Sequence, residues 1–567
     1  MISLLRKNNI NVFEIIVALL LGFAFAAAPH YINKGECYFT IGYFIVSIIL
    51  GIIFIVSASI IRVLIKSNIS KSYENRFVSF IYRIIWERNH PLLILTIIIF
   101  LLQLPLLILL YPGTLINDSW WQLNMYQEFI NTGKGLSDHH PIIDTFILGI
   151  IIFPLTKLFA NVQVAFFIYV LIQSLCTSFA FAFTLHYADK KLNIRKGALI
   201  FFLLMYIFLP LYTMSVQTIS KDAFFSWIFI IWLTLFVEII RSKGDSLNSK
   251  SGFIYFILIS LSCCVTKKVS IYILTLSIVM VIIFLRKKFI KLLSVLAIIL
   301  AVMFIIMPLS FKAMNITKGG KQEMLSMPFQ MTARYVTYYK DEMPNDELEV
   351  IDKVIGLDNI EERYDPLNAD PIKGFGQRAD GEYYDKYIKV WFKEGKNHPK
   401  VYFESAFAMM SGWFSLYPAT PLLNMNHHTS LRNLFDEDVT RRHGFFESTA
   451  EMVQNIMDTW GKIPVLNFFI SYGLYAILIP SFAVCTLFNS KEKRKNKYWL
   501  VAVPIALSVI IGLFLAPLSM HIEGKRYLYP LTYSAPLILM WLMYTAGFKN
   551  KDKDTYEVND SYNNHHE

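Results

Sequence analysis

Titratable side chains gather at both ends of one polar loop, residues 112–141, in an otherwise apolar chain. Asp118 follows the start of the loop, and Asp138, His139 and His140 stand just before its end. A carboxylate and an imidazole that converge can remove and deliver a proton, which is general acid–base chemistry. Because apolar runs flank the loop, both of its ends are tied to one membrane surface, where these four residues can meet. We therefore take them as candidate catalytic residues, the alternative being that the two acids only cap the helices that follow them.

The same loop raises the alternative of a metal site. Asp and His side chains ligate divalent ions, so a divalent cation is the candidate cofactor. Adjacent histidines on one chain rarely point at one metal, and the sequence lacks the HExxH spacing of a zinc-binding helix. The sequence leaves the metal unassigned.

Cationic side chains recur at three other short turns between apolar runs. They are Lys221 with Asp222, Lys267 with Lys268, and Arg526. Lysine and arginine bind phosphate through charge-assisted hydrogen bonds, and a lysine at a membrane boundary is costly unless it is paired or useful. Each cation alone is explained by snorkelling or by local pairing. Three such turns together favour an anion site for a phosphate or diphosphate.

One further acid, Asp144, lies inside the apolar stretch 142–158. An ionisable residue at membrane depth is a functional candidate, although a place near the start of a helix also suits the membrane interface. We include Asp144 among the candidate substrate-binding residues.

The composition around these turns is that of a membrane protein. Of 567 residues, 55% are hydrophobic and 17% are charged, and the mean hydropathy is +0.46. This is too little charge for a soluble surface, which excludes a cytosolic enzyme, a secreted disulfide scaffold and a disordered chain. The five cysteines form no CxxC pair, so we expect neither a zinc site nor a disulfide framework. The net charge of +11 fits basic cytoplasmic loops rather than nucleic-acid binding.

Twelve apolar runs approach the length of about 20 residues that a membrane-spanning helix needs. They are 12–29, 40–64, 91–111, 163–186, 198–215, 223–240, 253–266, 270–285, 290–309, 463–487, 498–517 and 527–546. With both termini cytoplasmic, the basic clusters at 6–7, 66–88, 190–196, 241–243, 286–291, 491–497 and 549–553 all fall on the cytoplasmic side, as the positive-inside rule requires, and Lys267-Lys268 on the outer side violates that rule. Counting 142–158 as a further crossing would break this pattern, so we predict that it is a re-entrant or interfacial helix beside a cavity.

These runs predict an all-α polytopic protein of the cell membrane with its candidate site on the extracytoplasmic face. Five parts are expected: two N-terminal transmembrane helices with a basic cytoplasmic loop (1–90), a membrane core with the first outer loop (91–309), a small extracytoplasmic α-rich domain (310–462), C-terminal transmembrane helices (463–547) and a disordered cytoplasmic tail (548–567).

In this arrangement the chain resembles the GT-C superfamily of membrane glycosyltransferases, and more closely a largely uncharacterised group of polytopic proteins from low-GC Gram-positive bacteria. The resemblance covers roughly residues 91–546. The matching motifs, in chain order, are Pro112-Gly113 with Asp118-Ser119 and Gln122; His139-His140-Pro141 with Thr145 and Gly149; Lys221-Asp222; Pro328 with Gln330, Ala333 and Arg334; Asp370-Pro371-Ile372-Lys373; His398-Pro399 with Tyr402; and Arg526-Tyr527 with Pro530. The chain departs from the pattern at Asn117-Asp118-Ser119, where the superfamily often has paired acids, and at Lys267-Lys268, where the group often has an arginine.

The resemblance implies an enzyme that transfers a sugar, with inversion, from a polyprenyl-phosphate donor to an acceptor in the cell envelope. It implies that Asp118 is the general base and that Lys267, Lys268 and Arg526 hold the phosphate of the leaving group. The further substrate-binding candidates are Gln122 and Arg334. The implied partners are the lipid-linked donor, a glycan or polymer acceptor and the bilayer, and nucleic acid is not expected.

Two other classes of protein stay open at the level of the sequence. A transporter or flippase for lipid-linked saccharides often has inverted halves with broken helices at matching positions, and no such internal symmetry is visible. A non-catalytic scaffold or sensor accounts for the hydrophobicity but leaves the acids and cations of the outer turns unexplained.

Overall fold

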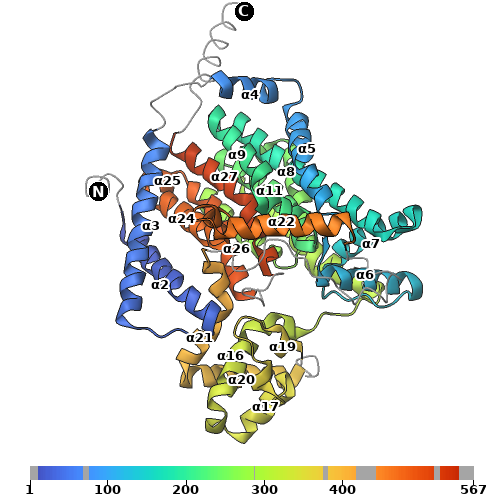
Figure 1. Cartoon of the computed structure of the whole chain (residues 1–567), viewed down its shortest axis with the longest axis vertical. Helices are drawn as coiled ribbons and strands as arrows, with labels where there is room; N and C mark the ends of the chain where they lie inside the picture. The colour runs from blue at the N-terminus through green and yellow to red at the C-terminus, as the bar shows by residue number, and fades with distance from the viewer. Residues whose placement is uncertain are drawn as a thin grey trace, which may run out of the picture.

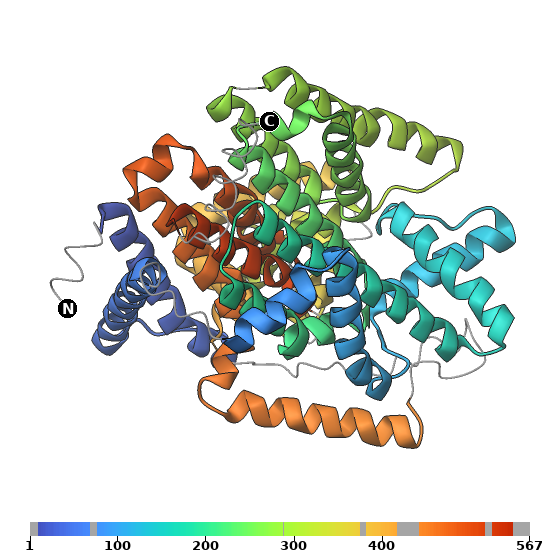
Figure 2. The ribbon, with the colours of Figure 1, turned by 90° about the horizontal axis from the view of Figure 1, so that it is seen from above.

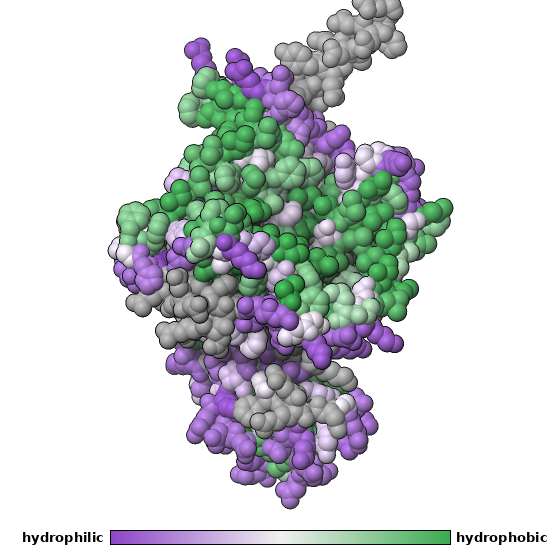
Figure 3. Space-filling model, turned by 90° about the vertical axis from the view of Figure 1, so that its right-hand side faces the viewer, coloured by the Kyte–Doolittle hydropathy of each residue, from purple (hydrophilic) through white to green (hydrophobic). Residues whose placement is uncertain are grey.

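The computed structural model describes residues 10–67, 76–286, 288–374, 381–416, 442–515 and 524–547. Over these ranges the chain is a bundle of apolar helices with a smaller helical domain at one end (Figure 1). In this described part, the sheet structure consists of one pair of two-residue strands. Figure 3 shows apolar side chains over the bundle and polar side chains over the small domain, which is the surface of a multi-pass membrane protein with a domain outside the bilayer.

The bundle is built around α11 (Lys221–Arg241), the most enclosed of the apolar helices. It packs against α8 (Val162–Lys190), α12 (Lys250–Thr266) and α27 (Tyr529–Thr545). These helices are apolar around their circumference, so they need a protein or lipid neighbour on every side. Large aromatic side chains fill the shared core, among them Phe181, Tyr206, Trp232, Tyr533 and Trp541.

Each of the twelve predicted apolar runs falls on helical structure. In the described part, eight helices are long and apolar enough to cross a membrane; they include the helix Ile142–Phe159, which we predicted to be re-entrant or interfacial, and they do not include α27. A ninth span results if α9 (Lys196–Phe208) and α10 (Pro210–Val216), which meet at a 50° bend, count as one. Three shorter apolar helices come in addition, including α12 and α13 (Ser270–Leu285). The all-α membrane class is confirmed, and the number of crossings stays a prediction.

Two N-terminal helices stand at the edge of the bundle. α2 (Val12–Lys34) and α3 (Ile41–Ser67) pack closely because Gly22 lies against the backbone of α3, where a Cβ atom would clash. Glu14 and Arg62 form a buried ion pair between the two helices.

The stretch 142–158 forms a single helix, α7 (Ile142–Phe159), which does not return within itself. The chain instead turns at Ala160 and comes back along α8. Leu148 and Ile152 of α7 share a core cluster with the first turns of α8, including Phe166. The far end of α8 lies beside α4 (Arg76–Trp86), where Asp189 accepts a hydrogen bond from Tyr82. α7 therefore packs only against the first part of the long helix α8.

The small domain comprises α16 (Ser326–Tyr339), α17 (Asn345–Ile355), α18 (Ile360–Arg363), α19 (Asp370–Lys373), α20 (Gly381–Asn397) and α21 (Pro399–Met410). It has its own core, in which Phe329 packs edge-on against Tyr387. The predicted domain, 310–462, extended too far, because α22 (Phe445–Lys462) leaves this domain and lies across the helix bundle (Figure 1). The predicted tail, 548–567, lies outside the described residues.

Candidate functional site

A short parallel strand pair places the first loop beside the turn before α11. β1 (Thr114–Leu115) pairs with β2 (Thr218–Ile219), and one residue separates each strand from the helix after it. Asp118 in α6 (Asn117–Thr132) and Asp222 in α11 therefore occupy matching positions in the first turns of two neighbouring helices. Ser119 Oγ donates a hydrogen bond of 2.9 Å to the carbonyl oxygen that ends β2. Both carboxylates gain from the partial positive charge of a helix N-terminus.

Three cations bind these two carboxylates. Lys221 Nζ lies 2.8 Å and Arg526 Nη2 lies 3.1 Å from Asp118 Oδ2. Arg526 Nε lies 3.4 Å from Asp222 Oδ2, and Lys267 Nζ lies 2.6 Å from Asp222 Oδ1. We call these five residues the charge cluster. Three cations against two carboxylates leave one net positive charge, which favours an anionic ligand.

The cluster fixes the protonation of two residues outside the spans. Burial raises the pKa of Asp118, but Arg526 and Lys221 outweigh burial and hold that pKa well below its usual range. Burial and the nearby Lys221 ammonium lower the pKa of His140 well below its usual range. Lys221 Nζ lies 3.0 Å from His140 Nδ1 and, as an ammonium, donates to it. Near pH 7 the site thus pairs a carboxylate with a neutral imidazole.

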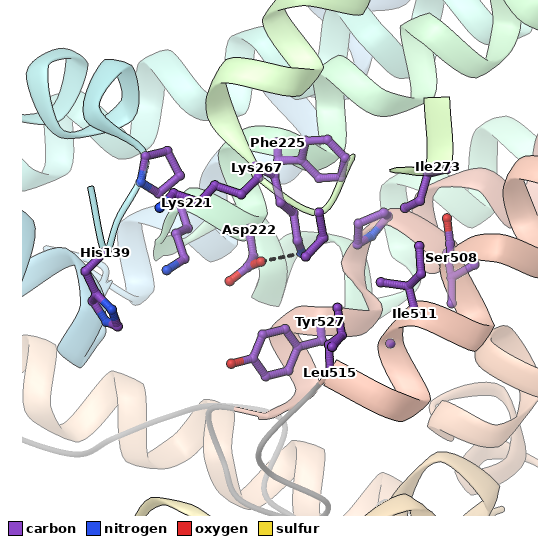
Figure 4. A pocket seen from close by; sticks show the side chains of 16 residues that line it. His139, Lys221, Asp222, Phe225, Lys267, Ile273, Ser508, Ile511, Leu515 and Tyr527 are labelled. Carbon is purple, nitrogen blue, oxygen red and sulfur yellow. Dashed lines mark hydrogen bonds and ion pairs between the residues drawn. The ribbon is translucent and has the colours of Figure 1, made fainter. Parts of the chain in front are cut away.

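A cavity of about 190 Å³ adjoins the charge cluster (Figure 4). His139, Lys221, Asp222, Lys267 and Lys268 line its polar end. The apolar end lies between α13 and α26 (Ala502–Leu515) and is lined by Ile273, Ser508, Ile511, Gly512 and Leu515. Ile510 and Phe514 of α26 and Tyr272 and Leu276 of α13 have exposed side chains. The cavity thus joins a cationic end to helices that present apolar surface to the outside of the bundle.

Asp138 binds the segment that leads into the small domain, which separates it from Asp118. Its backbone N–H donates to the carbonyl oxygen of Thr317 at 2.8 Å, and its carboxylate accepts from the N–H of Gly319. Lys268 Nζ lies 3.4 Å from Asp138 Oδ1. Asp138 therefore fastens the loop that carries His139 to the segment before the small domain, and Lys268 ties the same loop to the turn between α12 and α13.

Gln122 and Asp144 form a buried pair behind the charge cluster. Gln122 Nε2 donates to Asp144 Oδ2 at 2.7 Å and to Thr145 Oγ1 at 3.2 Å. Both side chains are fully enclosed, so the pair supports the first turns of α6 and α7 rather than lining the cavity.

Arg334 lies outside the site. Its guanidinium is buried in the small domain, where Nη2 lies 2.9 Å from Glu404 Oε2 and Nη1 donates to Tyr364 OH and to the carbonyl oxygen of Gly35. The sequence-based expectation that Arg334 joins the phosphate-binding cations is wrong, because these partners hold it against the N-terminal helix pair.

The sequence leaves a divalent cation open as an alternative, and the described ranges contain no group of three His, Cys, Asp or Glu side chains that could ligate one. The oxygens of Asp118 face ammonium and guanidinium groups instead. In the described part of the chain, cationic side chains therefore occupy the positions around Asp118 that a metal ion would need.

Several residues of the site were missed at the sequence level. Lys267 Nζ lies 5.3 Å from the ring centre of Phe225 and 5.7 Å from that of Tyr527, which makes two cation–π contacts. Arg442 donates to the carbonyl oxygens of Leu110 and Gly113, directly before β1. Phe225 lies inside an apolar run, and Arg442 lies outside every motif. No pattern in the sequence therefore indicates that either residue belongs to the site.

Fold and site together define a multi-pass helical membrane protein with a charged cavity at the ends of its helices. The chain belongs to DUF6020, a family of unknown function, and matches that family over residues 11–557. No curated protein and no solved structure matches the chain.

Proposed function

We propose that this protein is a membrane glycosyltransferase of the GT-C type, which moves a sugar from a polyprenyl-phosphate donor to an acceptor of the cell envelope. The observation that carries the proposal is the cavity itself, with Lys221, Lys267 and Lys268 at one end and apolar residues of α13 and α26 at the other. A lipid phosphate has the same two-part chemistry. Its charge requires cations in a site of low dielectric, and its chain requires an apolar path.

Asp118 is the general base in this proposal. Binding of the donor phosphate releases the Asp118 carboxylate from the cations that hold it. At rest Lys221 and Arg526 both bind its carboxylate and make it a weak base. A phosphate that enters the cavity competes for these cations, which raises the basicity of the released carboxylate. In the reaction the acceptor oxygen bonds to the anomeric carbon and its proton passes to Asp118. The bond from that carbon to the phosphate oxygen breaks, and polyprenyl phosphate leaves with the bonding electrons, stabilised by the cations.

The proposed topology has twelve crossings, both termini in the cytoplasm and the charge cluster on the extracytoplasmic side. The basic helix α25 (Lys491–Lys495) and α4 lie at the end of the bundle opposite the small domain (Figure 1). Basic segments are retained in the cytoplasm. α7 then lies at the outer half of the membrane beside the site, as a re-entrant or interfacial helix would.

The test is transfer of a radiolabelled sugar from its polyprenyl phosphate by the protein in lipid nanodiscs, with envelope glycan as acceptor. We expect label in the glycan with wild type and none with Asp118→Asn. Transport of lipid-linked saccharides is the second candidate, favoured by the broken span α9–α10. Passage of labelled donor across vesicles without a new glycosidic bond would select that candidate and overturn the enzymatic one.

A further inference from the structure

α22 differs from the spanning helices in direction. Figure 1 shows it lengthwise across the front of the bundle, across the direction of α3, and Figure 2 shows it along one edge of the molecule. It is also the helix that holds the first loop, because Thr449 Oγ1 donates to the carbonyl oxygen of Leu109 at 2.8 Å and Arg442, just before it, donates to the turn after α5 (Pro91–Leu109).

Three kinds of surface run along α22. Thr449, Ala450, Val453 and Met457 are buried against the bundle. Phe445, Met452 and Ile456 recur at helical spacing beside that buried face, and their side chains are 68%, 47% and 43% exposed. The polar residues gather on the remaining side: Glu447, Ser448, Glu451, Asn455, Asp458 and Lys462. A helix with a protein face, an apolar face and a polar face suits a boundary between protein, lipid and water.

The exposed apolar stripe has the exposure of a lipid-facing surface. On the spanning helix α26, Ile510 and Phe514 are 51% and 55% exposed. The stripe continues past the end of α22 in Ile463, Val465 and Phe469, which are also exposed and lead into the last part of the bundle. A row of apolar side chains this long is costly in water, and it is continuous with a surface that faces lipid.

We propose that α22 is an in-plane membrane helix, seated in the bilayer interface by Phe445, Met452 and Ile456 with its acidic side in water. The occupant of the stripe is the lipid of the surrounding bilayer. Because the polar side carries Glu447, Glu451 and Asp458 against Lys462, apolar contact rather than attraction to anionic headgroups holds the helix. This inference concerns placement in the membrane and does not depend on the proposed enzymatic function.

Nitroxide labels on single introduced cysteines test the placement. The variants Met452→Cys and Ile456→Cys are compared with Glu451→Cys and Asp458→Cys in phosphatidylcholine nanodiscs, by relaxation with lipid-soluble oxygen and with a water-soluble nickel chelate. The labelled parent protein supplies the background of the native cysteines. We expect labels at 452 and 456 to relax several-fold more with oxygen than with nickel, and labels at 451 and 458 to show the reverse.

Labels at 452 and 456 that respond mainly to nickel would place the stripe in water and overturn the proposal. Labels there that respond to neither agent would mean that protein covers the stripe, and would overturn it as well. Should one variant fail to elute as a monodisperse peak, Phe445→Cys carries the same comparison.

Discussion

Arg526 Nη2 and Asp118 Oδ2 lie 3.1 Å apart, although one residue stands in the first polar loop and the other in the last turn before α27. Arg526 is nearly buried and also reaches Asp222. A guanidinium that bridges two carboxylates is costly to bury unless all its charges are balanced. Charged groups brought together from α6, α11 and the last turn before α27 therefore indicate a functional site rather than a purely stabilising ion-pair network.

Replacing Asp118 by asparagine is predicted to abolish transfer while the protein still folds. The amide keeps the shape of the carboxylate but cannot take a proton, and loss of a general base costs about 10²- to 10⁴-fold in rate. Sugar transfer in nanodiscs measures the effect. Asp458→Asn, an exposed acid on α22, is the matched control and should be fully active. Transfer by the Asp118→Asn variant at the wild-type rate would show that Asp118 is not the general base.

The positions of the helices and the convergence of distant turns were predictable, for different reasons. Apolar runs of this length have few alternatives to helices in a membrane, so each run marks a helix. The topology predicts Asp118, Lys267 and Arg526 at polar turns on one membrane face, and in the structure Asp118 and Arg526 are in direct contact. Their roles in binding and catalysis stay predictions.

Other features depend on contacts that no local pattern encodes. Strands of two residues carry no periodic signal, so the β1–β2 pairing that aligns Asp118 with Asp222 was not foreseeable. Arg334 lies beside the motif residues Gln330 and Ala333 in the sequence, but it pairs with Glu404, which no sequence pattern relates to it. The stretch assigned to one outer domain divides because α22 buries Ala450, Val453 and Met457 against the bundle.

Replacing Lys268 by glutamine is predicted to weaken binding of polyprenyl phosphate about tenfold, or about 1.4 kcal/mol. Lys268 lines the cavity, and because its side chain is 51% exposed, loss of its ion pair with Asp138 should lower the free energy of unfolding by no more than about 1 kcal/mol. Equilibrium binding of the lipid phosphate in nanodiscs, followed by native mass spectrometry, gives the ratio. Lys134→Gln, an exposed lysine in the first polar loop, is the control and should bind like wild type. Equal affinities for the two variants would argue against a phosphate at Lys268.

Acidification is predicted to destabilise the protein partly through His140. Its folded pKa lies below the unfolded value of about 6.5, so the unfolded chain takes up the proton first. The contribution is complete above about pH 6.5 and is lost as pH falls below it, by about 1.4 kcal/mol per pH unit. Thermal unfolding between pH 8 and pH 5.5 should show a smaller fall for His140→Gln than for wild type. Parallel falls in the two proteins would contradict the buried neutral imidazole.

Replacing Arg442 by glutamine is predicted to lower both stability and transfer. The change removes the Arg442 donor from the carbonyl oxygen of Gly113, whereas that of Leu110 keeps the N–H of Gly113. A buried acceptor that loses its partner costs about 1–3 kcal/mol. Arg442→Lys should recover part of both losses, since an ammonium still donates to these oxygens. The thermal midpoint and the transfer rate are the two measurements. Lys462→Gln, at the far end of α22, is the control, and an unchanged Arg442→Gln protein would remove the link between α22 and the site.

Filling the apolar end of the cavity is predicted to discriminate against long lipid chains. Ile511 lines the cavity, whereas its neighbour Ile510 faces outward and is 51% exposed. Ile511→Trp should lower kcat/KM for the polyprenyl donor at least tenfold and spare a short-chain donor, while Ile510→Trp should change neither. A loss that is the same for both chain lengths would point to damaged folding instead of a blocked path.

The most direct measurement is a cryo-EM structure in nanodiscs with a polyprenyl phosphonate analogue of the donor, which cannot be cleaved. The account predicts the phosphonate among Lys267, Lys268 and Arg526, the lipid chain between α13 and α26, and the Asp118 carboxylate released from at least one of its cations and facing the sugar. An analogue bound away from the charge cluster, or an Asp118 still held by both Lys221 and Arg526 beside a bound sugar, would contradict it.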